Sequence, residues 1–310
     1  MAILPLDHGI FASAFASEPT GAAGYFAGGI TTAGRVTTIE RFLFADDSRS
    51  AAAAGLSAGR GGCAGMASSV AGYVGGGFNT AGAKVDTVDR FLFSANTRTT
   101  LGTGLSTTRQ ALAAMASSVA GYFGGGFEDT GNTATVDRFL FSDDSRTTLG
   151  TGLSAATETP AGMASSVAGY FGGGYVSARV DTVDRFLFSS DSRTTLGTGL
   201  SSDRMKQAGF ASSVAGYFAG GTVRPAGSTY AVDTVDRFLF SNDSRTTLGT
   251  GLSAATYNFA GMASSVAGYT GGGSGYVTTV DRFLFSNDSR TTLGTGLSDG
   301  TYQLAAFAHP

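Results

Sequence analysis

The sequence predicts an all-β fold, a six-bladed β-propeller made of four-stranded blades. Two observations support this prediction: a long consensus recurs six times, and each copy contains four short strand candidates separated by turn residues, without helical periodicity. The 310-residue chain is rich in glycine, with 48 residues, while 23 Phe and 11 Tyr supply material for a core. Repeats that each form one small sheet are typical of propellers.

The repeat is marked by the tripeptide Asp-Arg-Phe, with Glu in place of Asp in the first copy. Arg41 and Arg282, the arginines of the first and last copies, are 241 residues apart (282 − 41) in five steps, which is about 48 residues per repeat. The copies are Glu40-Arg41-Phe42, Asp89-Arg90-Phe91, Asp137-Arg138-Phe139, Asp184-Arg185-Phe186, Asp236-Arg237-Phe238 and Asp281-Arg282-Phe283.

The third copy shows the expected first half of a blade. Residues 115–119, Met-Ala-Ser-Ser-Val, have small side chains. They predict the innermost strand, because six such strands crowd around the axis, and its serines are expected to line a narrow channel. Residues 121–126, Gly-Tyr-Phe-Gly-Gly-Gly, predict an aromatic second strand that ends in glycines able to adopt positive φ.

The second half of the blade follows in the same copy. Residues 135–142, Thr-Val-Asp-Arg-Phe-Leu-Phe-Ser, place Asp137, Phe139 and Phe141 on one face and predict the third strand. Residues 143–146 predict a polar turn. Residues 147–154 are polar and glycine-rich, which suits an outer edge strand. Aromatic side chains of the second and third strands are expected to stack between blades.

The C-terminal run is predicted to close the ring. Residues 301–308 align with residues 256–263, a run that enters an innermost strand. We therefore expect the chain end to supply the innermost strand of the first blade, whose other strands are predicted over residues 24–29, 37–45 and 50–57.

Closure by the C-terminus divides the chain into residues 1–18, an N-terminal extension, and residues 19–310, the propeller. Ile3, Leu4 and Phe11 are among the apolar side chains of the extension. Burial of such side chains is favourable, so we expect the extension to act as an anchor on a neighbouring subunit or particle protein. Packing along its own propeller is the alternative.

The glycine cluster carries a resemblance to a known family. An aromatic followed by glycines recurs at 73–77, 122–126, 170–174 and 217–221, after a small strand and before a Val-Asp-x-Phe-x-Phe strand. Over residues 20–310 the chain resembles the kelch repeat, which implies a β-propeller. It departs from the kelch pattern where Phe replaces Tyr (Phe93, Phe141, Phe188, Phe240 and Phe285) and where Thr replaces Trp (Thr99, Thr147, Thr194, Thr246 and Thr291). More loosely, the near-identical copies are similar to kelch-like repeats of bacteriophage or prophage virion proteins.

Kelch propellers include sugar oxidases and isomerases, so the sequence must be tested for catalytic groups. The chain has two histidines, His8 and His309, and neither lies inside a repeat where it could activate a serine or bind copper. Its single cysteine, Cys63, excludes a multi-cysteine metal site. The sequence predicts no catalytic residue, no metal site and no cofactor.

The repeated charged residues are interpreted as structural. The Asp-Arg pair occurs in every copy, whereas a catalytic site normally occupies one asymmetric pocket. Ion pairs within or between blades are therefore expected, with ligand contact as the alternative. The turn arginines are expected to hold the turns; they are Arg49, Arg98, Arg146, Arg193, Arg245 and Arg290.

Two linkers vary between copies, the one between strands two and three and the one from strand four to the next blade. Because strands alternate in direction, both linkers should emerge on one face, here called the variable face, and the constant turns on the opposite, constant face. Loops on a rigid scaffold commonly bind partners, and aromatic residues and Arg dominate such contacts. The candidate binding residues are Arg109, Phe127, Tyr175, Arg179, Arg204, Arg224, Tyr230 and Tyr257. Unconstrained drift of the loops is the alternative.

Charge and hydropathy argue against two classes of partner, nucleic acid and the membrane interior. The formal net charge of −3 and the absence of a Lys/Arg run argue against nucleic acid, and no apolar stretch is long enough for membrane insertion. Residues 14–16, Ala-Phe-Ala, resemble a signal-peptidase site, but the preceding segment lacks Lys and Arg, so a cleaved signal peptide is not expected.

The sequence favours a non-catalytic binding or assembly module. The expected setting is a virion or an extracellular surface, where the protein is a decoration or tail-associated adhesin of a phage or prophage. Expected partners are virion or surface proteins, glycans, and a second copy through the extension. A glycan-binding lectin is the first alternative, and a kelch-type sugar-converting enzyme is the second.

Overall fold

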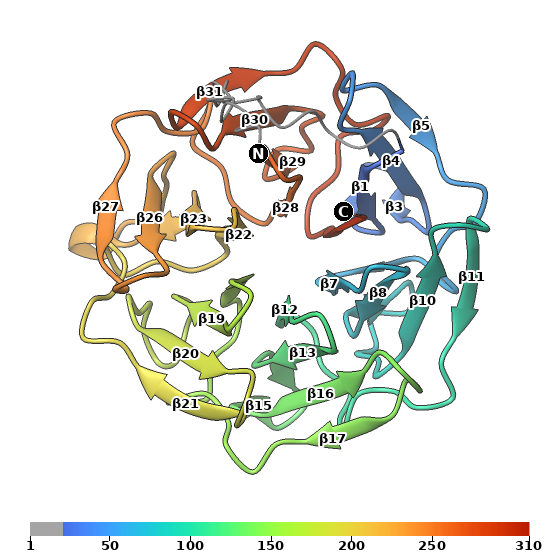
Figure 1. The fold of residues 1–310 in the computed structure, drawn as a ribbon, viewed down its shortest axis with the longest axis horizontal. Coiled ribbons are helices and arrows are strands. Elements are labelled where there is room, and N and C mark those ends of the chain that lie inside the picture. Colours follow the sequence, from blue (N-terminus) through green and yellow to red (C-terminus); the bar gives the residue numbers. More distant parts are fainter. Residues whose placement is uncertain (1–20, 310) are drawn as a thin grey trace, which may run out of the picture.

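Six antiparallel four-stranded sheets surround a central axis, as the sequence predicts (Figure 1). The structure is a computed structural model that describes residues 21–309. The predicted extension over residues 1–18 lies outside the described residues. In every blade the strand order runs from the axis to the rim, and the rim strands follow the circumference of the ring (Figure 1).

The blades are given with their strands from the axis outwards. Blades 1 to 3 are β32 (Ala305–His309), β1 (Ala23–Ala27), β4 (Ile39–Leu43) and β5 (Arg49–Ala51); β7 (Ala64–Ala67), β8 (Ala71–Gly75), β10 (Val88–Leu92) and β11 (Thr97–Thr100); β12 (Ala113–Ala116), β13 (Ala120–Gly124), β16 (Val136–Leu140) and β17 (Arg146–Thr148). Blades 4 to 6 are β18 (Ala161–Ala164), β19 (Ala168–Gly172), β20 (Val183–Leu187) and β21 (Ser192–Thr195); β22 (Ala208–Ala211), β23 (Ala215–Ala219), β26 (Val235–Leu239) and β27 (Arg245–Thr247); β28 (Ala260–Ala263), β29 (Ala267–Gly271), β30 (Val280–Leu284) and β31 (Ser289–Thr292).

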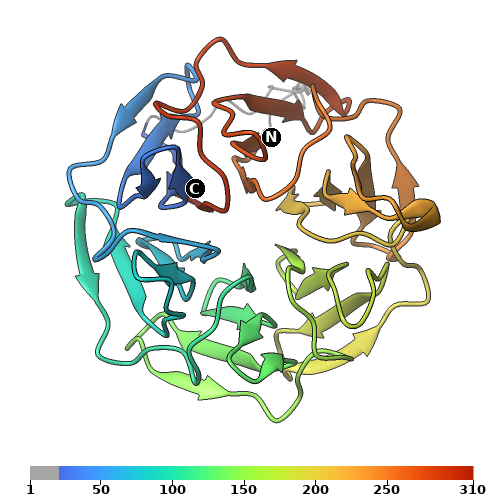
Figure 2. The ribbon, with the colours of Figure 1, turned by 180° about the vertical axis from the view of Figure 1, so that it is seen from behind.

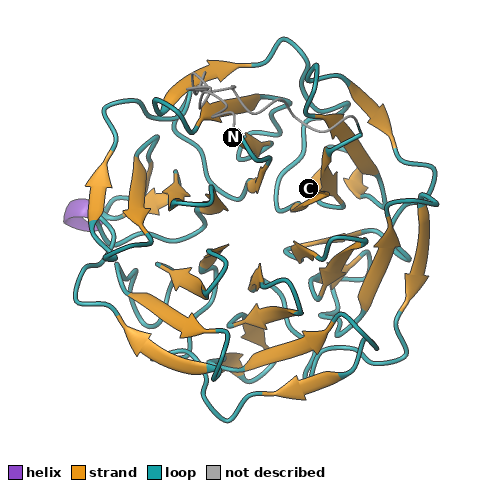
Figure 3. Cartoon of the chain, in the orientation of Figure 1, coloured by secondary structure: helices purple, strands orange, loops and turns teal. Residues whose placement is uncertain are grey.

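Short elements decorate the linkers. They are β2 (Ile30–Thr31), β3 (Gly34–Arg35), β6 (Arg60–Gly61), β9 (Phe78–Asn79), β14 (Phe127–Glu128), β15 (Gly131–Asn132), β24 (Thr222–Val223), β25 (Tyr230–Ala231) and the 3-10 helix η1 (Pro225–Gly227). The helix η1 lies at the outer edge of the ring (Figure 3). No helix among the described residues has the length and apolar character needed to cross a bilayer.

Closure of the ring by the C-terminal strand is confirmed. The strand β32 pairs antiparallel with β1, so that Phe307 lies opposite Tyr25. The two rings stack with centroids 5.1 Å apart, and Phe307 also lies against Gly72 of the next blade. The two ends of the described chain therefore form one sheet, and β1 is paired on both sides instead of forming an open edge.

The innermost strands begin earlier than predicted. In the third blade β12 covers Ala113–Ala116, and the predicted channel serines lie in the following turn. The Oγ of Ser117 accepts hydrogen bonds from the backbone N–H groups of Val119 and Ala120, at 3.2 and 3.0 Å. The serines predicted to line a channel from the innermost strand therefore lie outside that strand, and Ser117 caps the turn that follows it.

The second position of each innermost strand is glycine or alanine, because neighbouring strands lie too close together at the axis for a larger side chain. A Cβ added at Gly162 would collide with the carbonyl oxygen of Ala114 in the preceding blade. The third position holds a larger side chain that points to the following blade, where Met115 lies against Gly169. The blades therefore interlock at the axis, which explains the small residues and glycines of the consensus.

The outer strand is shorter than predicted. In blade 3 it spans Arg146–Thr148 instead of residues 147–154. The chain then turns inward, and Leu153 is buried. The close approach of Gly152 to the carbonyl of Ala134 leaves no room for a side chain. The Gly-Thr-Gly consensus thus serves the crossing to the next blade and not the edge strand.

Aromatic stacking between blades is confirmed. The Phe that follows the third strand stacks on the Tyr of the second strand in the preceding blade, as Phe141 does on Tyr73 with centroids 5.3 Å apart. The same pair forms at each of the six junctions: Tyr25–Phe93, Tyr73–Phe141, Tyr122–Phe188, Tyr170–Phe240, Tyr217–Phe285 and Tyr269–Phe44. Phe in place of the kelch Tyr therefore still fills the junction.

At five of these junctions an aspartate of the constant turn adds a hydrogen bond to the Tyr and an ion pair to the motif arginine. Asp144 accepts a hydrogen bond from Tyr73 at 2.8 Å and lies 3.4 Å from Arg90 of the Asp-Arg-Phe motif. Burial and the hydrogen bond to Asp144 raise the pKa of Tyr73, which keeps this donor protonated. The equivalent carboxylates are Asp47, Asp191, Asp243 and Asp288, while Asn96 takes this place between blades 1 and 2.

The six blades also share a closed circle of backbone hydrogen bonds on the axis. The N–H of one residue per blade donates to the carbonyl of its counterpart in a neighbouring blade, at 2.6 to 3.2 Å. All six residues have positive φ, between 54° and 65°, and they line a cavity of about 90 Å³. The residues are Gly62, Ala111, Thr159, Lys206, Asn258 and Gln303.

Removal of residues 301–310 should abolish the single cooperative unfolding transition, because it removes the innermost strand of blade 1. The point change Phe307→Ala should cost about 3–5 kcal/mol of unfolding free energy, measured by chemical denaturation. Val119→Ala, at an exposed position, is the control. An unchanged melting transition in the shortened chain would contradict closure.

The axial circle predicts a stabilising substitution. Thr159 is β-branched, has φ 54° and buries an Oγ1 that has no hydrogen-bond partner among the described residues. Asn tolerates this conformation better, so Thr159→Asn should raise the unfolding free energy by about 1 kcal/mol. The reciprocal change in blade 6, Asn258→Thr, should lower it by a similar amount. If the two variants had the same unfolding free energy as each other, the argument from backbone strain would be refuted.

Candidate functional site

The structure places the two variable linkers of each blade on one face of the ring. In blade 3 a bridge joins Gln110, which precedes β12, to Phe127, which follows β13. On the opposite face the constant turns meet, where the N–H of Phe141 donates to the carbonyl of Val119 at 3.0 Å. The two faces of the ring are seen in Figure 1 and Figure 2.

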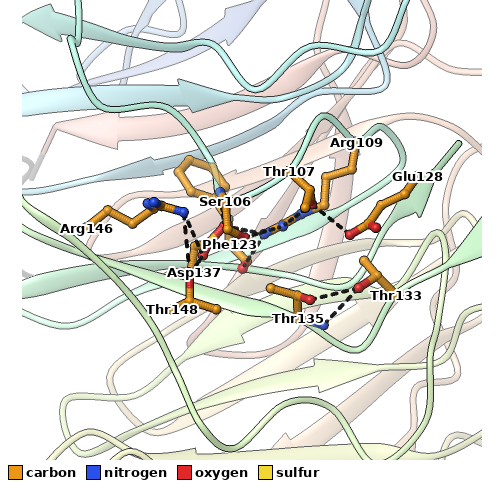
Figure 4. Close-up of polar contacts among 10 residues, drawn as sticks. All are labelled: Ser106, Thr107, Arg109, Phe123, Glu128, Thr133, Thr135, Asp137, Arg146 and Thr148. Carbon is orange, nitrogen blue, oxygen red and sulfur yellow. Dashed lines mark hydrogen bonds and ion pairs between the residues drawn. The ribbon is translucent and has the colours of Figure 1, made fainter. Parts of the chain in front are cut away.

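Two of the eight candidate binding residues are in the interior and not on the variable face. Arg109 and Arg204 are each 0% exposed. Arg109 donates to Asp137 at 2.9 Å (Figure 4), and Arg204 to Asp236 at 2.6 Å. Burial lowers the pKa of both guanidinium groups, and the adjacent carboxylate acts in the opposite direction. The expectation that these two arginines are exposed is wrong, because their partners are the buried aspartates of the repeat.

A signal for this burial is present in the sequence. Arg60, Arg109 and Arg204 each follow the serine of a Gly-Leu-Ser run by three residues. A fixed distance from the consensus means that these arginines belong to the repeat, although they lie in linkers of variable sequence. Arg179 and Arg224 have no such fixed distance.

Two further candidates lie under lysine side chains. The Nζ of Lys84 is 4.8 Å from the ring centroid of Phe127, and the Nζ of Lys206 is 5.5 Å from that of Tyr257. Tyr230, in β25, is 56% exposed. These three aromatic side chains belong to blades 3, 6 and 5, so they are spread along the variable face instead of forming one site.

The remaining candidates meet in one cleft between blades 4 and 5. Tyr175, Arg179 and Arg224 line a cavity of about 560 Å³. The motif argument did not identify Asp203 and Pro225, which also line it. A cleft of this size is in the range that takes a small molecule or the side chains of a partner segment.

The arginines of the cleft are arranged by hydrogen bonds to backbone and hydroxyl groups. Arg179 Nε donates to the carbonyl of Thr222 at 3.0 Å, and its Nη2 to Thr229 Oγ1 at 3.2 Å. Arg224 Nε donates to the carbonyl of Gly227, in η1, at 2.9 Å. These bonds leave other guanidinium N–H groups of both residues to contact a ligand.

The two arginines of the cleft form no ion pair within 4.0 Å among the described residues, although Asp203 also lines the cleft. Most arginines of the chain pair with Asp or Glu within 4.0 Å, but within residues 21–309 Arg179 and Arg224 form no such pair. Desolvation lowers the pKa of Arg179, and the like charge of Arg224 lowers it further. Two cations held close together in a concave surface favour the binding of an anion.

Groups suited to metal binding are not gathered in the described part of the chain. Residues 21–309 contain no cluster of three His, Cys, Asp or Glu side chains. His309 packs on Phe93 with centroids 4.6 Å apart, and His8 lies outside the described residues. Burial raises the pKa of Cys63, which disfavours its thiolate.

The repeated charges hold strands and blades together. The arginines expected to hold the turns instead join strand four to strand three, as Arg146 does 3.7 Å from Asp137 (Figure 4). In five blades the arginine of the Asp-Arg-Phe motif reaches the neighbouring blade, as Arg138 does 3.2 Å from Asp191, whereas Arg41 donates to the carbonyl of Gly21 in its own blade. Neither set lines the cleft between blades 4 and 5.

Comparison with known proteins identifies the architecture. Among solved structures the chain is similar to the one described as "Structure of YjhT", with a TM-score of 0.69 over 89% of this chain and 99% of that chain. The chain has the fold of a six-bladed β-propeller with four-stranded blades. Sequence identity to that structure is 15%, so the likeness concerns the fold alone. No protein-family model and no curated protein sequence matches the chain.

Because Arg109 is buried and Arg179 lines the cleft, we expect their substitutions to differ strongly in their effect on stability. Arg109→Met leaves the buried Asp137 carboxylate without its closest cation and should cost about 3–5 kcal/mol of unfolding free energy. Arg179→Met is the matched control at the cleft and should change it by less than about 0.5 kcal/mol. Chemical denaturation measures both. Similar losses in the two variants would show that Arg179 is also structural.

Proposed function

We propose that the protein is a non-catalytic binding module and that its ligand presents an anionic group to the cleft between blades 4 and 5. The observation that carries the proposal is the pair Arg179 and Arg224, which line one cavity of about 560 Å³ together with Tyr175. Guanidinium groups recognise carboxylates through paired, charge-assisted hydrogen bonds.

The rest of the ring acts as the scaffold for this cleft. Tyr175 is fixed by its bridge to Glu158 and by a tight turn to Arg179. Arg224 comes from the linker that carries η1 in the next blade. The ligand thus binds where the linkers of two blades meet, and the repeated core stays unchanged.

The setting of this binding module is proposed from the sequence resemblance. In a phage or prophage virion, the protein serves as a decoration or tail-associated adhesin, and the cleft contacts an acidic segment of a particle protein or an acidic glycan of the host surface. Co-purification with assembled particles tests this setting separately from the binding chemistry.

The binding chemistry is tested with two immobilised probe sets, hexuronate-bearing oligosaccharides with neutral counterparts, and Glu-rich peptides with Gln counterparts. Arg179→Gln and Arg224→Gln should each weaken binding of the acidic probe by about tenfold or more, because each removes a charged hydrogen bond. Arg35→Gln, on the variable face of blade 1, is the control and should bind normally.

The outcome separates the two ligand sources. Preference for the hexuronates identifies a glycan-binding protein, and preference for the Glu-rich peptides identifies an assembly protein. Equal binding of acidic and neutral probes, or normal binding by both cleft variants with unchanged melting temperature, would overturn the proposal.

A further inference from the structure

The position three residues after the Gly-Leu-Ser serine divides the blades into two classes. It is arginine in blades 2, 3 and 5 and threonine in blades 4, 6 and 1. The arginines are Arg60, Arg109 and Arg204, and the threonines are Thr157, Thr256 and Thr301. The repeat therefore supplies an internal guanidinium group to only half of its blades.

All three arginines donate to the aspartate of their blade and to the carbonyl of the second-strand residue opposite it, but the Nη1 of Arg109 contacts the hydroxyls of Ser106 and Thr107 instead of a third acceptor carbonyl. Arg204 Nη2 donates to Asp236 Oδ2 at 2.6 Å and to the carbonyl of Phe218 at 3.2 Å, and its Nη1 to the carbonyl of Thr234 at 3.3 Å. Arg60 binds Asp89 and the carbonyls of Val74 and Thr87 in the same way. Figure 4 shows the guanidinium of blade 3 beside its aspartate.

Blade 6 has the same acceptors around a cleft. Asp281, Thr270 and Thr279 are the counterparts of Asp236, Phe218 and Thr234, and they line a cavity of about 70 Å³. Asp281 Oδ2 accepts hydrogen bonds from the N–H and Oγ of Ser253, both at 2.8 Å. In blades with arginine, the equivalent oxygen accepts these two bonds and a third from the guanidinium.

Thr256 does not replace the missing guanidinium. Its Oγ1 is buried and has no hydrogen-bond partner among the described residues. The nearest cation to the carboxylate is Arg290, 3.5 Å from Asp281 Oδ1. The equivalent outer arginine is present in the other class too, where Arg245 lies 3.5 Å from Asp236 in addition to the buried Arg204. The carboxylate of blade 6 therefore has one cation fewer than that of blade 5.

Among the three threonine blades, blade 6 offers the most space. The clefts of blades 1 and 4 measure about 20 Å³ each, which is room for about one water molecule. Phe26 and Phe171 line those clefts, whereas blade 6 has the smaller Thr270 at this position. In blade 1 the longer side chain of Glu40 also reaches Ser298. The exposed residues Ser253, Ala254 and Ala255 form the rim of the blade 6 cleft on the variable face.

We propose that the blade 6 cleft binds a guanidinium group from outside the chain, which takes the place that Arg60, Arg109 and Arg204 fill in their own blades. The group donates to Asp281 Oδ2 and to the carbonyls of Thr270 and Thr279. The ligand is an arginine-like cation, either a free small molecule or an arginine side chain of a partner. This site is separate from the cleft between blades 4 and 5 and does not depend on its function.

The test is a titration of the whole chain with two guanidinium probes, agmatine for a free molecule and Nα-acetyl-arginine amide for a protein side chain. The neutral control is Nα-acetyl-citrulline amide. Backbone NMR shifts of Ser253 and Thr270 should saturate with either guanidinium probe and not with citrulline. Tighter binding of the arginine amide identifies a partner side chain as the source, and tighter binding of agmatine identifies a small molecule.

Two substitutions locate the site. Thr256→Arg supplies an internal guanidinium, as blades 2, 3 and 5 do, and should weaken probe binding by about tenfold or more. Asp281→Asn keeps the shape of the acceptor but removes its charge, and should weaken binding to a similar extent. Thr157→Arg makes the same change in blade 4 and should leave binding unchanged. A cooperative melting transition confirms that each variant is folded.

Three results would overturn the proposal. One is the absence of saturable shifts with both guanidinium probes, and another is equal binding of the citrulline amide. The third is wild-type affinity in both Thr256→Arg and Asp281→Asn.

Discussion

A buried carboxylate on the third strand of every blade is the interaction on which the ring depends. In blade 3, Asp137 accepts hydrogen bonds from Ser106 in the linker that arrives from blade 2 and from Thr148 of the outer strand. One side chain thus joins its own blade to the chain that enters from its neighbour. Because a buried charge is stable only with such partners, the serine and threonine of the consensus recur with the carboxylate.

The same carboxylate explains how a symmetric scaffold acquires asymmetric sites. Where the linker supplies an arginine, as Arg109 does, the charge is neutralised inside the protein. Where the linker supplies a threonine, as Thr256 does, a cleft lies beside the acid. A threonine in place of the arginine therefore removes a buried ion pair and leaves a cleft that opens on the variable face. The strands around the position stay the same.

The circle of backbone hydrogen bonds at the axis introduces backbone strain into the ring. Six backbone hydrogen bonds require positive φ in every blade, and residues such as Thr159 and Lys206 adopt it without being glycine. Residues in this conformation store strain that the surrounding structure must offset. The interlocked innermost strands and the aromatic stacks at the six junctions supply that stabilisation.

The period, the strand pattern and the C-terminal copy of an innermost strand were sufficient to predict six blades and closure by the chain end. These features are local or repeated, so the sequence displays them directly. The shift of the innermost strand was not predicted, because Ser117 is compatible with both a strand and a turn, and only its hydrogen bonds to Val119 and Ala120 distinguish them.

For the variable linkers, too, the sequence predicted some features and the structure was needed for others. Their sequence identified Tyr175, Arg179 and Arg224, and the structure places these three residues in one cleft because the linkers of adjacent blades lie side by side. Arg109 looked equivalent in sequence but is buried. The sequence by itself determined the repeat, the fold and the face that varies. Only the tertiary structure decided which arginines meet a buried acid and which face the solvent, because that depends on distances between segments about 30 residues apart in the chain.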